Sequence, residues 1–189
     1  MNAILPTEKT YLKLSIFDIW KSRIPWLLLL MVSATFTGKI IEHYEESLAS
    51  MVILTAFIPM IMDTGGNAGG QSSATIIRSL SLNDIEFKDL LKVMFKEIRV
   101  ALFVGITLAA ANFLKLLLID RVSATVAAVV CSTVVLTVCV AKVIGCSLPM
   151  IAKKLKFDTA VMASPFITTI VDAVSLFIYF KIAVTLLHI

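Results

Sequence analysis

The stretch PMIMDTGGNAGGQSSATIIRSL, residues 59–80, decides how the rest of the chain is interpreted. It lies inside a hydrophobic segment, yet its centre is polar and rich in glycine. The polar residues are Asp63, Thr64, Asn67, Gln71 and Ser72, and the glycines are Gly65, Gly66, Gly69 and Gly70. An unpaired polar group in hydrocarbon is costly. We therefore expect this stretch to be packed inside protein or to line a wet cavity.

The apolar segment around this stretch runs from about residue 48 to residue 80. That is too long for one straight membrane crossing at about 1.5 Å per residue. We expect the helix to break near Gly65–Gly70, with Pro59 loosening its first half by removing a backbone donor. A broken helix presents free carbonyl and N–H groups, which ion pathways use.

The composition is typical of a membrane protein. The 189 residues are 59% hydrophobic, with a mean hydropathy of +0.96, whereas soluble domains are about 45–50% apolar. The net charge of +4 does not indicate nucleic acid, because the bases lie in loops and form no stripe with exposed aromatics. The first residues lack the pattern of a cleaved signal peptide.

The predicted fold is an all-α membrane protein with five transmembrane helices in residues 24–189, preceded by an amphipathic interfacial helix in residues 1–23. The spans are expected at about 24–41, 48–80, from the charged stretch 83–99 to 118, 123–144 and 161–187. Pro25 suits a first helical turn, and Gly145 with Pro149 is expected to close or kink the fourth span. Three cysteines, Cys131, Cys139 and Cys146, are interpreted as small packing residues, because no metal or disulfide pattern includes them.

The distribution of basic residues predicts the orientation in the cell membrane. With five spans, residues 1–23, 78–99 and 142–156 share one side and hold thirteen Lys and Arg residues, against four elsewhere. The positive-inside rule then places the N-terminus in the cytoplasm and the C-terminus outside. Glu42 and Glu46, one helical turn apart, would face outward, either as a solvated acidic loop or as a cation-attracting mouth.

Asp172 is the main candidate for an ion-binding residue. It lies near the middle of the last span, where a carboxylate is costly and by default marks an ion or proton pathway. Thr168, Thr169 and Ser175 lie at i−4, i−3 and i+3 and extend a polar stripe on the same face. Pro165 frees a backbone carbonyl one turn earlier. The alternative is a structural contact of a neutral or paired aspartate.

Asp63 and Asn67 are the second candidates, one turn apart with glycines between them. Mg²⁺ takes oxygen ligands and gives up its waters reluctantly, so few carboxylates with amide and hydroxyl oxygens suit a hydrated ion. Five spans cannot form two equal halves, and a pore of sufficient girth is expected to need a second copy of the chain. In such a dimer Asp172 would occur twice and balance the ion's charge.

Two motifs resemble the transmembrane domain of the MgtE family of magnesium channels and transporters. The first is PMIMDTGGNAGGQ, residues 59–71, in which Pro59, Gly66, Asn67, Gly69 and Gln71 carry the pattern. The second is PFITTIVD, residues 165–172. The resemblance extends from about residue 21 to the C-terminus and includes the spacing between the motifs.

The resemblance implies a homodimer that conducts hydrated Mg²⁺ between helices two and five of both subunits. Asp172 corresponds to the family's pore aspartate, Asn67 and Thr168 to pore positions, and Glu46 to an acidic position near the mouth. With Asp63, these residues form the expected ion-binding set. Further residues expected along the pore are Pro59, Gly65, Gly66, Gly69, Gln71, Pro165, Thr169 and Ser175.

The chain departs from the family pattern in two ways. Family members usually carry an acidic N-domain and a pair of CBS domains that sense Mg²⁺, and nothing of that kind precedes Lys21 in this sequence. The sequence is either a piece of a longer protein or a short homologue, and in both cases closure of the pore by those domains cannot be carried over to it. Asp63 stands where a small residue such as glycine is expected, and an extra carboxylate there would add a cation site or change ion selectivity.

Other functions fit the sequence less well. An enzyme is not expected, because the only histidines, His43 and His188, lie near span ends and no HExxH or GxSxG motif occurs. An ion-coupled carrier of another solute and a non-transporting assembly subunit stay open as alternatives. The polar centre of residues 59–80 and Asp172 argue against the assembly subunit.

Overall fold

The structure is a computed structural model that describes residues 14–156 and 159–189. Within these residues it is helical throughout, with no strand, as the composition predicts. The helices are α1 (Ile16–His43), α2 (Glu45–Ser50), α3 (Ile58–Ser81), α4 (Leu90–Leu118), α5 (Ala124–Lys154) and α6 (Thr159–Leu187). Short 3-10 helices at Val52–Phe57 and Phe87–Asp89 precede α3 and α4.

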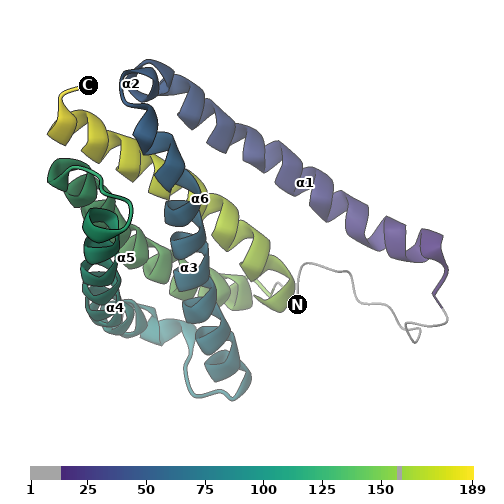
Figure 1. The fold of residues 1–189 in the computed structure, drawn as a ribbon. Helices are drawn as coiled ribbons and strands as arrows, with labels where there is room; N and C mark the ends of the chain where they lie inside the picture. Colours follow the sequence, from purple (N-terminus) through teal and green to yellow (C-terminus); the bar gives the residue numbers. More distant parts are fainter. Residues whose placement is uncertain (1–13, 157–158) are drawn as a thin grey trace.

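Helix α5 is the centre of the bundle and packs against α3, α4 and α6 (Figure 1). Its buried residues are mostly small or β-branched, which allows neighbouring helices to approach closely. Tyr179 on α6 joins the core and donates a buried hydrogen bond of 2.9 Å to the Leu54 carbonyl. This bond fixes the segment before α3 to α6.

Helix α1 lies at the side of the bundle and has no buried residue (Figure 1). Its contacts are mainly with α6, and they include an edge-on pair of Trp26 with Phe166, 6.0 Å between ring centroids. The helix starts at a capping box in which Asp18 N donates to Ser15 Oγ and Ser15 N donates to Asp18 Oδ2.

The start of α1 differs from the expected start of span one. Pro25 lies inside the helix and not in its first turn, because the capping box begins the helix earlier. Residues 16–23 therefore continue directly into the span. Residues 1–13 of the expected interfacial helix lie outside the described residues, so a position of this segment at the membrane surface stays a prediction.

The expected break at Gly65–Gly70 is wrong, because α3 is continuous from Ile58 to Ser81. No described glycine has a positive φ, so these glycines keep helical geometry. Pro59 lies at the start of α3, where its missing N–H costs nothing, and does not loosen the helix. The excess length of this segment is taken up earlier, by α2 and the 3-10 helix at Val52–Phe57.

Helix α5 is also longer than expected, because Gly145 and Pro149 lie inside it and do not end it. Both are buried, and packing on the neighbouring helices supports the helix past them. Helix α4 ends at Leu118 and α6 at Leu187, where the sequence predicts the ends of the third and fifth spans.

Four helical segments among the described residues are long and apolar enough to cross a membrane. They are Ile16–His43, Phe87–Leu118, Ala124–Lys154 and Phe166–Leu187. Helix α3 is not among them, because its polar residues, which include Asp63, Asn67 and Gln71, lower its mean hydropathy. The apolar helices agree with a membrane protein, and they correspond to four of the five expected spans, all but the one at 48–80.

Candidate functional site

A groove of about 600 Å³ runs between α3 and α6. Ten residues line it, and polar side chains come from both helices. Those from α3 are Met62, Asp63, Gly66, Asn67, Gly70, Gln71 and Ala74, and those from α6 are Ile167, Thr168 and Asp172. The four residues predicted to bind an ion, Asp63, Asn67, Thr168 and Asp172, are all among them.

The α3 wall of the groove follows from helical spacing. Asp63, Asn67 and Gln71 are spaced by four, so they share one face of the helix. All three are exposed. Gly70, between them, has no atom within 4 Å of the position that a Cβ would take. The glycine positions on this face leave open space in the groove.

The α6 wall presents Thr168 and Asp172, also one turn apart. Thr168 is exposed, and its Cγ2 atom lies 3.7 Å from the position that a Cβ of Gly66 would take. The groove thus brings together carboxylate, amide and hydroxyl oxygens. These are ligands that hard divalent cations prefer. The described part of the chain has no group of three or more His, Cys, Asp or Glu side chains that could together hold a metal ion.

The opposite face of α3 is packed against the bundle. A Cβ on Gly65 would lie 2.7 Å from Val171 Cγ1 and 3.0 Å from Ser175 Oγ. A Cβ on Gly69 would lie 2.8 Å from Ile167 Cγ2, and one on Gly145 would overlap the Gly69 carbonyl. Gly65, Gly69 and Ser175, which were expected along the pore, therefore lie in helix contacts and do not line the groove.

The remaining predicted residues whose side chains are described lie outside the groove lining. Pro59 is exposed at the start of α3, and Thr169 is half-buried on α6. The side chain of Pro165 is outside the described residues. Glu42 pairs with Lys39 at 2.7 Å on the exposed surface of α1, and Glu46 is exposed on α2.

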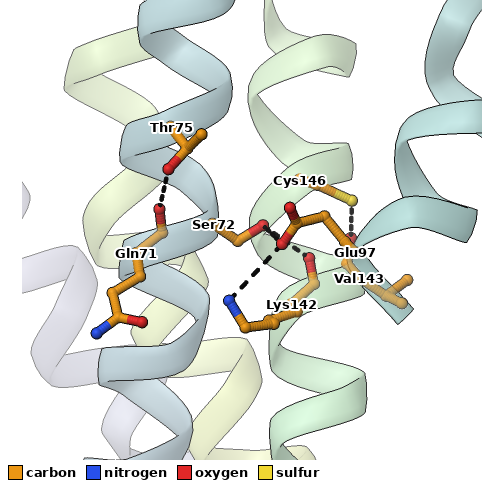
Figure 2. Close-up of polar contacts among 7 residues, drawn as sticks. All are labelled: Gln71, Ser72, Thr75, Glu97, Lys142, Val143 and Cys146. Carbon is orange, nitrogen blue, oxygen red and sulfur yellow. Dashed lines mark hydrogen bonds and ion pairs between the residues drawn. The ribbon is translucent and has the colours of Figure 1, made fainter. Parts of the chain in front are cut away.

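One polar cluster was not predicted. Ser72 of α3 donates a hydrogen bond of 2.8 Å to Glu97 Oε2 of α4, and Lys142 Nζ of α5 lies 3.7 Å from the same oxygen (Figure 2). The sequence counts Lys142 among the basic residues of the cytoplasmic stretch 142–156. In the structure it lies inside α5, which continues past it and buries its side chain. The signal was an isolated lysine within the apolar run VCVAKVIGC, residues 138–146.

Comparison with known proteins finds similarity to one family. Residues 58–182 match the family model MgtE, described as a divalent cation transporter. The chain is 36% identical over 166 residues to the magnesium transporter MgtE of Bacillus subtilis, covering 88% of this chain and 37% of the relative. It is 30% identical over 192 aligned positions to that of Thermus thermophilus, covering 100% of this chain and 41% of the relative.

A third relative, the magnesium transporter MgtE of Enterococcus faecalis, is 34% identical over 164 residues, covering 85% of this chain and 35% of the relative. The chain thus spans well under half the length of the curated relatives it matches. The family is one of transporters and not of enzymes. The matched region contains the whole of α3, α4 and α5 and both walls of the groove, and the chain belongs to the MgtE family of divalent cation transporters.

Proposed function

We propose that this chain is an ion-conducting membrane domain that passes hydrated Mg²⁺ along the groove between α3 and α6. The observation that carries the proposal is the convergence of Asp63, Asn67, Thr168 and Asp172 in that groove. The names of the relatives, all magnesium transporters, support Mg²⁺ as the transported ion.

The size of the groove is compatible with a hydrated ion. Six waters at about 30 Å³ each fill about 180 Å³, less than the groove volume of about 600 Å³. Mg²⁺ keeps most of its waters when it binds to proteins. In the proposal Asp172 and Asp63 attract the ion by charge and accept hydrogen bonds from its waters. Asn67 and Thr168 contact the same water shell.

A homodimer with the groove near its symmetry axis forms part of the proposal. The α3 wall is exposed in the single chain, since Asp63, Asn67 and Gln71 all lie open. A second copy facing this wall would enclose the path and shield the ion from lipid. Two copies of Asp172 would then balance the charge of a divalent cation.

The proposed topology has five spans, with α3 as the second. At about 1.5 Å per residue, its 24 residues reach about 36 Å, which exceeds a bilayer core of about 30 Å. Moving Lys142 from a loop into α5 changes the basic count from thirteen against four to twelve against four. The bias still favours a cytoplasmic N-terminus, an extracytoplasmic C-terminus and an outward position for Glu42 and Glu46.

The test is Mg²⁺ uptake into proteoliposomes by the parent chain, Asp172→Ala and Asp84→Ala. Asp84 is an exposed acid in the loop between α3 and α4 and serves as the matched control. We expect uptake by the parent and by Asp84→Ala, and its collapse in Asp172→Ala. Uptake that survives in Asp172→Ala would remove this residue from the mechanism and contradict the proposed path.

A further inference from the structure

Three polar side chains from three helices meet behind α3, on the side away from the groove, and the Glu97 side chain is 15% exposed there. Ser72 and Lys142 are 2% and 5% exposed. Ser72 Oγ lies 2.8 Å from Glu97 Oε2 and 3.2 Å from the backbone carbonyl oxygen of Lys142. Figure 2 shows the three side chains pointing toward one another from α3, α4 and α5. The cluster therefore joins the groove helix to two scaffold helices at one point.

Stability alone does not explain this cluster. Burying an ion pair costs solvation energy, and apolar residues of similar volume are often as stable or more so. Lys142 Nζ is 3.7 Å from Glu97 Oε2, which is beyond hydrogen-bond distance, so the pair lacks the close hydrogen-bonded geometry that best offsets this cost. The best-attested use of such buried polar groups is to fix the register between helices.

The helix contact beside the cluster does little by itself to fix the rotation of α3 against α5. Gly69 of α3 and Gly145 of α5 meet without side chains between them. Helices normally hold their relative rotation by fitting side-chain ridges into grooves, and two facing glycines offer neither. Ser72 is three residues after Gly69, and Lys142 is three residues before Gly145. The polar cluster thus lies about one turn from a smooth contact.

We propose that the Ser72–Glu97–Lys142 cluster fixes the rotation of α3 about its axis and so directs Gln71 and Asn67 into the groove. Gln71 and Ser72 are adjacent and lie about 100° apart around the helix. A rotation that releases Ser72 from Glu97 turns Gln71 by the same angle. The three residues act on the ion path only through α3, so they are positioning residues.

The direct test measures the rotation of α3 about its axis and does not depend on Mg²⁺ transport. A single reporter, Gln71→Cys, is labelled with a water-soluble thiosulfonate in the full chain, with the unsubstituted parent as background for the native cysteines. Ser72→Ala is then compared with Ser73→Ala. Ser73 is the matched control, because it is a buried serine on the same helix and makes no hydrogen bond among the described side chains.

We expect the labelling rate at Gln71→Cys to change about threefold to tenfold with Ser72→Ala, as the loss of a typical intramolecular hydrogen bond allows. It should stay unchanged with Ser73→Ala. Equal rates in the two variants would overturn the proposal. Because the readout is labelling, failure of Mg²⁺ transport by the parent would contradict the proposed function without affecting this test.

A pair of double variants separates the hydrogen bond from the charges. Glu97→Gln with Lys142→Met removes both charges and keeps an acceptor for the Ser72 hydroxyl. Glu97→Leu with Lys142→Met also removes the side-chain acceptor and leaves Ser72 only its longer bond to the backbone carbonyl of residue 142. The first should label at the parental rate and the second like Ser72→Ala. Identical rates in the two double variants would contradict positioning through Ser72.

A transport measurement, which rests on the proposed function, tests whether the rotation of α3 affects Mg²⁺ binding. Misfolding lowers the maximal Mg²⁺ uptake rate by reducing the number of active molecules, but it leaves the half-saturating concentration unchanged. A rotated α3 changes the half-saturating concentration. Ser72→Ala should therefore shift that concentration relative to Ser73→Ala, and an unchanged value in both would limit the cluster to a structural role.

Discussion

Both faces of α3 carry glycines and polar residues, but one face is open to the groove and the other is packed against neighbouring helices. On the groove face, Asp63, Asn67 and Gln71 are exposed and Gly70 has open space around it. On the packed face, Gly65 and Gly69 touch α5 and α6, and Ser72 is tied to Glu97. One helix thus presents polar groups to a groove on one side and holds them in fixed contacts on the other.

The comparison shows that the glycines of this helix have two separate purposes. Gly69 and Gly70 are neighbours, but only Gly69 is required by a close helix contact. Gly70 keeps the groove open. Substitutions on the packed face should therefore change the stability of the protein, and substitutions on the groove face should change ion binding.

The largest effect is expected at the α3–α5 glycine contact. In Gly145→Ala the new Cβ would overlap the backbone of Gly69, which cannot move without displacing α3. Overpacking of this kind costs about 3 kcal/mol of unfolding free energy. Gly70→Ala, with open space, should be neutral or stabilise the helix by up to about 1 kcal/mol. Thermal unfolding in detergent measures both, and equal losses would contradict the assignment of the two faces.

A smaller effect on stability is expected at Tyr179, which holds the segment before α3. Tyr179→Phe leaves the Leu54 carbonyl without its buried partner. The expected loss is about 1–2 kcal/mol of unfolding free energy. Because Tyr179 does not line the groove, the half-saturating Mg²⁺ concentration should stay at the parental value. A shift in that concentration would show that the packed region takes part in ion binding.

Asp63→Asn should change the half-saturating Mg²⁺ concentration and leave stability nearly unchanged. It removes one groove carboxylate at nearly constant volume, so stability should change little. The loss of attraction for the ion is on the order of 1 kcal/mol, which raises the half-saturating Mg²⁺ concentration about fivefold. The control is Asp120→Asn. Asp120 lies in the turn between α4 and α5 and is paired with Lys115. Parental uptake and ion preference in Asp63→Asn would remove Asp63 from the path.

The smallest effect is expected at the exposed end of α1. Glu42 and Lys39 form a surface pair at 2.7 Å with both side chains mostly exposed. Such pairs contribute about 0.5 kcal/mol or less. Glu42→Gln should leave stability and uptake near parental values, because Lys39 already offsets the charge. A large fall in uptake at low salt would instead support Glu42 as part of an ion-attracting mouth.

The apolar helices could be predicted from the sequence, and so could the four expected ion-binding residues that share the groove. The ends of α4 and α6 agree with prediction because apolar runs and turns mark them. Asp63, Asn67 and Gln71 share a face by spacing alone, and the resemblance of residues 165–172 to a known motif connected Asp172 and Thr168 to them. A helical wheel would also have separated Gly65 and Gly69 from Gly66 and Gly70.

The remaining features depend on contacts between distant segments. A glycine-rich helix is unfavourable by itself, at about 1 kcal/mol per glycine, and α3 stays continuous because its glycines allow close packing on α5 and α6. The burial of Lys142 required knowing that α5 continues past Gly145. The pairing of Lys142 with Glu97 required the packing of α4 on α5, which no local pattern encodes.

The most direct test of the two-faced helix is thiosulfonate block of Mg²⁺ uptake in proteoliposomes containing Asn67→Cys or Ser73→Cys. Asn67 lines the groove and Ser73 is buried on the packed face. If the groove is the ion path, a positively charged reagent should stop uptake in Asn67→Cys and leave Ser73→Cys at the rate of the reagent-treated parent. Full uptake by Asn67→Cys, with labelling verified by mass spectrometry, would contradict the account.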